Sequence, residues 1–331
     1  MQTFLIGVYT QGDPSRGVRR LTLQGDALVD EGCVLPVEDP SYLMHGADDA
    51  LWGVSEGLGA PEGQLWRAQR QGSGYTRTAL WPAQGNSPCH LAQSPGGRWL
   101  AVANYGSGSV AVFDGSRPEA QACALFTGTL HGPDADRQEG PHAHFVHFRS
   151  EQELLCCDLG GDVLRCFREA RGVWAETAPL VAFAPGSGPR HLVLRGSLAY
   201  VACELSATLA VGDLATGRVL HSQPCVPNGA PGTVAAIRLT PEGHLMVSHR
   251  GADCISVLSL ANPERPSLLG TWACGGAGPR DVWPLEGGAL CACQSGNCIT
   301  LLRGDAAHGY MQVAATAVAA PVCILAETPL P

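Results

Sequence analysis

The chain contains no lysine, because all 21 of its basic residues are arginine. This absence excludes a Schiff-base lysine and the lysine of a P-loop, and with them two common mechanisms of catalysis. The formal net charge is -9 at pH 7. A chain of this charge lacks the basic face that binding to nucleic-acid phosphates requires, so we expect no nucleic-acid partner.

Long apolar runs and helical periodicity are also missing. No segment is hydrophobic over the length of a membrane span, and Phe4 opens a strand without the basic region of a signal peptide before it. We therefore expect a cytoplasmic protein without a membrane partner. Its 14 cysteines show no zinc-like spacing. We expect them to be reduced and packed as small hydrophobes, with no metal or cofactor.

A short phrase recurs along the chain about every 45 residues. Each copy has a proline or small residue, a short apolar strand, a turn such as Pro-Gly-Gly, and a second apolar strand that ends in a polar residue. Strand-rich repeats of this length are typical of the blades of a β-propeller. The copies occupy residues 40–56, 88–104, 141–158, 189–204, 234–250 and 279–294.

The number of blades follows from the number of second strands, each of which ends in a polar residue. The N-terminal run 4–9 is a second strand without a first strand before it, and residues 321–325 supply a first strand at the other end of the chain. We predict an all-β fold, a seven-bladed β-propeller in one domain over residues 1–331, with four strands in each blade. Pairing of 321–325 with 4–9 closes it and leaves no free sheet edge. The seven strand ends are Tyr9, Glu56, Asn104, Asp158, Glu204, His249 and Gln294.

Residues at equivalent places in successive blades should surround one mouth of the central channel, because the first strand starts where the second one ends. Arginine presents paired donors that match a carboxylate or phosphate, and histidine and glutamate are general acids or bases. The pattern predicts a site for a small polyanion with proton transfer beside it. The residues concerned are Arg190, Arg250, Arg280, His90, His142, His144, His191, Glu56, Asp158 and Glu204.

Simpler interpretations hold for several of these positions. Asn104 and Asp158 are favoured as turn caps, and His90 and His191 fit packing as well as they fit a site. His142 and His144 share one strand face, which favours function. The run 53–57 matches G-x-S-x-G, but a nucleophile elbow needs a strand-to-helix turn, so we reject it. The thiols of 291 and 293 are assigned to the core.

The sequence resembles a known family in several phrases. They are Pro-Cys-His-Leu at 88–91, Leu-Ala-Val-Ala-Asn-Tyr-Gly at 100–106, Arg-Gln-Glu-Gly-Pro-His-Ala-His at 137–144, Gly-Pro-Arg-His at 188–191 and Cys-Glu-Leu at 203–205. They resemble the seven-bladed lactonase family, which includes propeller-type 6-phosphogluconolactonases and, more distantly, the fungal 3-carboxy-cis,cis-muconate lactonizing enzyme. The resemblance spans nearly the whole chain.

The resemblance implies a catalytic set of four residues, namely His142, Arg190, Glu204 and Arg250. The same four lie at the predicted mouth. Substrate-binding roles are expected for Arg280, His144, His90, Glu56 and His191. The chain departs from the usual family pattern at 248–251, where His249 replaces an asparagine, and this substitution bears on the substrate.

We expect a sugar-lactone hydrolase, acting on the anion 6-phosphogluconolactone by general acid–base catalysis with arginines that bind the anion. Whether His142 or Glu204 is the base stays open at this point. One alternative is a non-catalytic scaffold that binds a partner protein on the disc face. Another is a metal-dependent lactonase with Glu56, Asn104, Asp158 and Glu204 as oxygen ligands, although the neighbouring arginines disfavour a dication.

Overall fold

The computed structural model of the protein describes residues 1–57, 62–117, 121–226 and 232–328. The chain divides into two compact units. The first consists of Met1–Tyr9, Arg19–Cys33 and Arg190–Pro331, and the second of Thr10–Val18 and Val34–Pro189. The prediction of a single domain over the whole chain stays a prediction.

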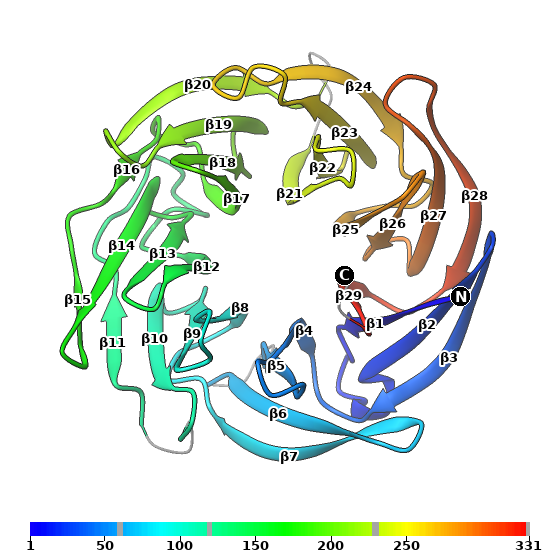
Figure 1. Cartoon of the computed structure of the whole chain (residues 1–331), viewed down its shortest axis with the longest axis horizontal. Coiled ribbons are helices and arrows are strands. Elements are labelled where there is room, and N and C mark those ends of the chain that lie inside the picture. The colour runs from blue at the N-terminus through cyan, green and yellow to red at the C-terminus, as the bar shows by residue number, and fades with distance from the viewer. Residues whose placement is uncertain (58–61, 118–120, 227–231, 329–331) are drawn as a thin grey trace. The chain divides into compact units, whose positions relative to one another are not determined.

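Among its described residues, the first unit holds four antiparallel four-stranded sheets (Figure 1). One sheet has the order β29 (Pro321–Ala326), β1 (Gln2–Val8), β2 (Val18–Gln24) and β3 (Ala27–Leu35). The next contains β17 (Pro189–Arg195), β18 (Leu198–Cys203), β19 (Thr208–Asp213) and β20 (Arg218–Pro224). The third contains β21 (Thr233–Leu239), β22 (Leu245–Arg250), β23 (Cys254–Ser259) and β24 (Ser267–Ala273). The fourth contains β25 (Pro279–Leu285), β26 (Gly288–Cys293), β27 (Cys298–Asp305) and β28 (Gly309–Ala317).

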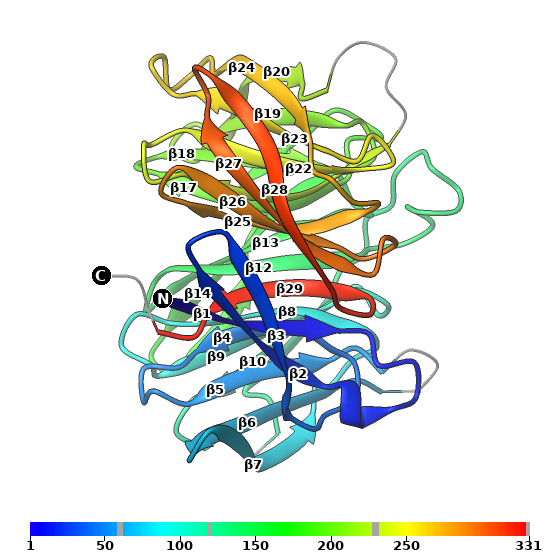
Figure 2. The ribbon, with the colours of Figure 1, turned by 90° about the vertical axis from the view of Figure 1, so that its right-hand side faces the viewer.

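The two ends of the chain meet in one sheet, as predicted. Strand β29 pairs antiparallel with β1, so that Phe4 faces Ala326 and Leu5 faces Leu325. Figure 2 shows the C-terminal strand, in red, beside the N-terminal strand, in blue. The pairing satisfies backbone groups that would otherwise form an exposed edge on each strand.

The described part of the second unit holds three sheets. The first contains β4 (Pro40–His45), β5 (Leu51–Ser55), β6 (Gln64–Gln71) and β7 (Gly74–Pro82). The second contains β8 (Pro88–Gln93), β9 (Trp99–Asn104), β10 (Ser109–Asp114) and β11 (Ala124–Thr127). The third contains β12 (Ala143–Ser150), β13 (Glu153–Asp158), β14 (Val163–Ala170) and β15 (Val173–Glu176). A short 3₁₀ helix, η1, spans Pro14–Arg16.

The third sheet of this unit differs from the prediction of four strands in every blade. A fifth strand, β16 (Val181–Ala182), pairs with β14 beyond the end of β15. Strand β15 ends at Glu176 and pairs only with the second half of β14, which leaves the first half open to β16. Two residues carry no pattern from which a strand could be predicted.

The hairpin between the first two strands of each sheet positions the polar residues named above. Pro88 pairs with Asn104, and Thr233 pairs with Arg250. The start of a first strand and the end of a second strand therefore lie at the same end of their sheet. The strands between these ends are apolar on both faces, and one buried cluster of the first unit includes Phe4, Ile6, Leu21, Leu290 and Ile299.

The seven sheets confirm the predicted fold class, an all-β seven-bladed propeller whose terminal strands share a blade. Cysteines lie in the apolar strands, where they pack as small hydrophobes, at positions 156, 157, 166, 203, 254, 291, 293 and 298. Within the described part of the chain, no helix has the length and apolar character needed to cross a bilayer.

Candidate functional site

Three of the four predicted catalytic residues form one charged cluster in the first unit. Arg190 is the second residue of β17, Glu204 follows β18, and Arg250 ends β22. The Glu204 carboxylate lies between the two guanidinium groups: its Oε2 is 2.9 Å from Arg190 Nε, and its Oε1 is 2.9 Å from Arg250 Nη2. Strand ends that are 60 residues apart in the chain are thus joined through one carboxylate.

Burial separates the roles of the two arginines. The Arg190 and Glu204 side chains are 3% and 2% exposed, whereas the Arg250 side chain is 24% exposed. Arg190 also donates from Nη1 to the Ala235 carbonyl at 2.7 Å. Arg190 is therefore held from several sides. Arg250 is the member of the cluster that solvent, and hence a ligand, reaches best.

His191 supports the same arginine. Its Nε2 lies 3.2 Å from Arg190 Nη1. A guanidinium group only donates, so Nε2 accepts and the ring carries its hydrogen on Nδ1. This contact makes His191 a neighbour of the cluster, which the sequence could not distinguish from a packing residue.

His142 lies in the second unit, immediately before β12. Its backbone N–H donates to Asp158 Oδ1 at 2.8 Å, and its ring stacks on Tyr105 with 4.4 Å between centroids. Ring Nδ1 is 2.9 Å from the Tyr105 carbonyl oxygen. Because a carbonyl only accepts, Nδ1 carries a hydrogen, and Nε2 is the nitrogen left for proton transfer.

Glu139 faces that second nitrogen. Its Oε1 lies 3.2 Å from His142 Nε2, and its side chain is 57% exposed. A hydrogen bond from the backbone amide of Glu139 lowers the pKa of its carboxyl, and the hydrogen bond with the His142 side chain lowers it further. Neither Tyr105 nor Glu139 is among the predicted site residues, although both lie in the family-like phrases around Asn104 and His142. His142 is thus arranged as a general base: the Tyr105 carbonyl orients its ring, and the exposed Glu139 carboxylate lies beside its second nitrogen.

The remaining predicted binding residues have mixed surroundings. His90 lies between Tyr42 and Phe145, with 4.0 Å from its ring centroid to each, and its Nδ1 accepts from a backbone N–H at 3.4 Å. These contacts are those of a packed core histidine. His144 meets Tyr105 edge-on at 5.6 Å. The Arg280 guanidinium lies over the Tyr9 ring at 5.4 Å.

The residues predicted to be turn caps, and the rejected nucleophile-elbow pattern at 53–57, have the contacts of structural residues. Asn104 donates to the Ala83 carbonyl at 3.2 Å, and Asp158 accepts from the Gly161 N–H at 3.0 Å. Ser55 ends β5, and its hydroxyl donates to the Glu38 carbonyl. A nucleophilic serine would instead lie exposed at a strand-to-helix turn, so this pattern is not a nucleophile elbow. Glu56 is 9% exposed, and its N–H donates to the Asp39 carbonyl at 3.1 Å.

No disulfide joins any of the 14 cysteines, all of which lie in the described residues. Burial raises the pKa of the Cys291 thiol and raises that of Cys156 to about 12, so both stay protonated. Cys274 is an exception, because a hydrogen bond from Cys293, with 3.9 Å between sulfurs, lowers its pKa.

Within the described ranges, no group of three or more His, Cys, Asp or Glu side chains is arranged to hold a metal ion.

His249 is buried rather than available to a substrate. It is 1% exposed, and neither ring nitrogen has a hydrogen-bond partner among the described residues. Burial lowers the pKa of its imidazole from 6.5 to about 4. The ring is therefore neutral near pH 7, and the titratable group that the sequence suggested at this position plays no acid–base part there.

This burial predicts acid-sensitive stability. The pKa of His249 is lower in the folded protein than in the unfolded chain, so the unfolded chain binds the extra proton between about pH 6.5 and pH 4. The free energy of unfolding should fall by about 3 kcal/mol across this window on account of His249. Urea denaturation of wild type and His249→Asn at a series of pH values measures the difference. Parallel pH dependences for the two proteins would contradict the prediction.

Comparison with known proteins decides the family. A family model described as a lactonase with a 7-bladed beta-propeller matches residues 3–326. The chain belongs to this lactonase family. The expected enzyme class, a lactonase, is confirmed by this membership.

Named relatives agree with the family. The 6-phosphogluconolactonase of Bacillus subtilis is 28% identical to this lactonase over 96% of each chain. A solved structure described as a putative 6-phosphogluconolactonase from Bacteroides fragilis is 26% identical, with a TM-score of 0.86, and covers 98% of this chain and 97% of its own. A periplasmic gluconolactonase from Pseudomonas aeruginosa is 25% identical, with a TM-score of 0.84 and 98% of both chains covered.

Proposed function

We propose that this lactonase hydrolyses 6-phosphogluconolactone to 6-phosphogluconate. The observation that carries the proposal is the pair of arginines joined through Glu204. The three side chains together have a net charge of +1 in an otherwise acidic chain. Two guanidinium groups suit a substrate that carries a phosphate and develops an oxyanion during the reaction. The names of the relatives from Bacillus subtilis and Bacteroides fragilis support the same substrate.

In the proposed reaction, water attacks the lactone carbonyl carbon. His142 Nε2 takes the proton from this water, and the carbonyl oxygen becomes an oxyanion that Arg250, backed by Arg190, stabilises. The bond between the carbonyl carbon and the ring oxygen then breaks. The protonated His142 returns its proton to the departing ring oxygen, which leaves a carboxylic acid and a hydroxyl group. The acid ionises at neutral pH.

The geometry around each residue supports His142 rather than Glu204 as the base. Both Glu204 oxygens are engaged at 2.9 Å by arginines, and protonation of this carboxylate would give up two buried ion pairs. His142 has its Nδ1 directed to a carbonyl and its Nε2 beside the exposed Glu139, which can move aside for water. Glu204 is then a positioning residue for the two arginines.

His142 belongs to a different compact unit from the arginine cluster, so its action on the same lactone is part of the proposal. It rests on the repeat: His142 immediately precedes a first strand and Arg190 is the second residue of one, whereas Glu204 immediately follows a second strand and Arg250 ends one. We also propose a cytoplasmic location, which the 14 cysteines without a disulfide support. Fractionation of cells that express the tagged chain tests this location.

Replacing Arg190 should mainly weaken the binding of the anionic lactone. Arg190→Ala removes one charged donor, and we expect KM to rise by about 10- to 150-fold, which corresponds to about 1.5–3 kcal/mol for a charge-assisted contact. Arg190→Lys should rescue part of this loss, because lysine keeps the charge but cannot hold Glu204 and Ala235 with one planar group. Steady-state kinetics measure both. A full rescue by lysine would contradict the predicted need for the planar group.

A hydrolysis screen tests the proposed substrate. The purified protein is offered 6-phosphogluconolactone, the unphosphorylated gluconolactone and an aliphatic lactone, with and without EDTA. We expect the phosphorylated lactone to have the highest kcat/KM and EDTA to have no effect. Preference for the unphosphorylated lactone would reassign the substrate. Loss of activity with EDTA that returns on addition of Ca²⁺ or Zn²⁺ would favour a metal-dependent lactonase, and no hydrolysis of any lactone would favour the scaffold.

A further inference from the structure

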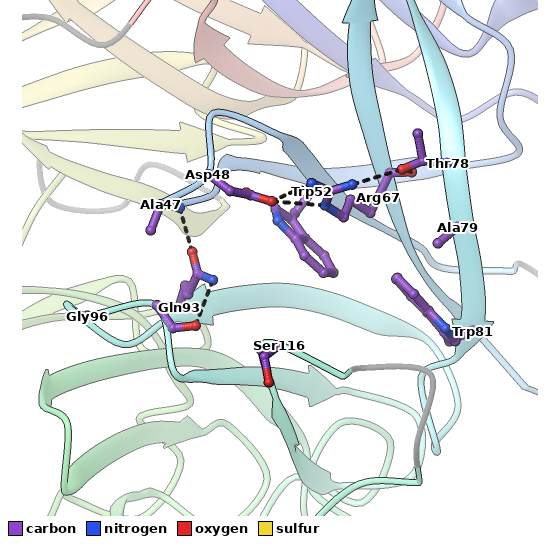
Figure 3. A pocket seen from close by; sticks show the side chains of 12 residues that line it. Ala47, Asp48, Trp52, Arg67, Thr78, Ala79, Trp81, Gln93, Gly96 and Ser116 are labelled. Atoms are coloured by element: carbon purple, nitrogen blue, oxygen red, sulfur yellow. Dashed lines mark hydrogen bonds and ion pairs between the residues drawn. The ribbon is translucent and has the colours of Figure 1, made fainter.

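A cavity of about 520 Å³ opens in the second unit, among residues that the proposed lactone chemistry does not use (Figure 3). It lies where the β4–β5 and β8–β9 hairpins turn, and strands β6 and β7 complete its wall. His45 pairs with Leu51 and Gln93 with Leu100 at this end of the two sheets, whereas Pro40 and Pro88 pair at the other end. The cavity is thus at the opposite end of these sheets from Glu56 and Asn104.

One wall of the cavity is aromatic. Trp52 and Trp81 stack with 5.8 Å between ring centroids and 20° between ring planes. Trp52 is only 2% exposed and anchors the pair in the core. Trp81, on the outermost strand of its sheet, is partly exposed, and in Figure 3 it lies on the opposite side of the view from Gln93, with Trp52 between them. A fixed indole ring is a flat apolar surface of the size of a six-membered ring.

The charges beside this wall cancel. Arg67 donates to Asp48 Oδ2 from Nε at 3.1 Å and from Nη2 at 2.5 Å, and its Nη1 donates to the Thr78 hydroxyl at 3.2 Å. Burial opposes the charge of Asp48, but the hydrogen bond and charge of Arg67 outweigh it and lower the pKa of the carboxyl. The pair is therefore ionised on both sides and presents no net charge to a ligand.

The facing wall carries an amide that is already fixed in orientation. Gln93 Oε1 accepts from the Ala47 N–H at 2.8 Å, and Gln93 Nε2 donates to the Gly97 carbonyl at 3.2 Å. Each contact uses only part of the capacity of the group, so one Nε2 hydrogen and one Oε1 lone pair remain. Asp48, with its side chain 47% exposed, keeps acceptor capacity in the same way. Polar groups held by the protein in this manner bind a ligand without first having to be ordered.

We propose that this cavity binds a neutral hexopyranose, either as a free sugar or as the end of a glycan. The cavity volume is in the range of small-molecule sites. Trp81 offers its ring to the apolar face of the sugar, while Asp48, Arg67 and Gln93 offer donors and acceptors to its hydroxyl groups. An anion finds no net positive charge here, and a purely apolar ligand would remove water from these polar groups without using their remaining donors and acceptors.

Titration with methyl β-D-glucopyranoside, followed by saturation-transfer NMR and calorimetry on the full chain, tests the proposal. We expect saturable binding with a Kd on the order of 1 mM, as is usual for a ligand of this size. Trp81→Ala should weaken it by about tenfold or more through loss of the aromatic surface, and Trp81→Phe should retain part of it. Lactone hydrolysis should be unchanged in both variants.

Leu80→Ala is the matched control, because Leu80 precedes Trp81 on the same strand and points to the opposite face. It should bind the glucoside as wild type does. Arg190→Ala should also bind it, which separates this cavity from the lactone site. If cellotriose binds more tightly than the glucoside, the ligand is the end of a glycan. If the two bind with equal affinity, the ligand is a free sugar. Absence of saturable binding, binding that survives Trp81→Ala, or binding that is lost in Arg190→Ala would each overturn the proposal.

Discussion

Replacing His142 with asparagine should lower kcat for the lactone by about 10²–10⁴-fold, the usual contribution of a general base. Asparagine can still donate toward the Tyr105 carbonyl but has no group that takes a proton from water. KM should change little, because the arginines that bind the anion are untouched. Steady-state kinetics with a thermal-melting check on each protein measure the effect.

His147→Asn is a matched control for this substitution. His147 lies on β12, the strand that His142 precedes, and it is not part of the proposed machinery. We expect near wild-type turnover from it. Glu139→Gln should reduce kcat by less than about tenfold, because the Tyr105 carbonyl still orients the ring. Wild-type turnover in His142→Asn would remove His142 from the mechanism and return the role of base to Glu204.

Replacing Glu204 with glutamine should both destabilise the protein and abolish most of its activity. Arg190 would keep its charge in a place where its side chain is 3% exposed, but it would lose its carboxylate partner. Breaking a buried pair in this way typically costs about 3–5 kcal/mol, because the charge that remains is not compensated. Urea denaturation measures the loss of stability, and kinetics at a temperature where the variant is folded measure the activity.

The exposed pair of Asp26 and Arg303 provides the control. The two side chains lie 2.8 Å apart and are 63% and 30% exposed, so Asp26→Asn should cost at most about 1 kcal/mol. A Glu204→Gln variant of full stability and no turnover would identify Glu204 as the base rather than a positioning residue. Full stability with full activity would exclude both roles.

The fold class and the ends of the strands could be predicted from the repeat alone. The repeat places a polar residue where each apolar strand stops, and the period is long enough to hold one blade. Pro88 and Asn104 therefore could be predicted as the two ends of a hairpin, and they pair in the structure. The closing pair of β1 and β29 followed from one strand in excess at each end of the chain.

The contacts between polar side chains, in contrast, depend on how the strands pack in three dimensions. The ion pairs of Glu204 with both Arg190 and Arg250 depend on side-chain directions at the ends of strands from two sheets, which the sequence period does not encode. Tyr105 and Glu139 lie outside the strands, where a residue has no repeating partner, so their contacts with His142 could not be predicted. The burial of His249 and the cavity beside Trp81 likewise arise from packing between sheets, and a linear pattern of apolar residues does not determine that packing.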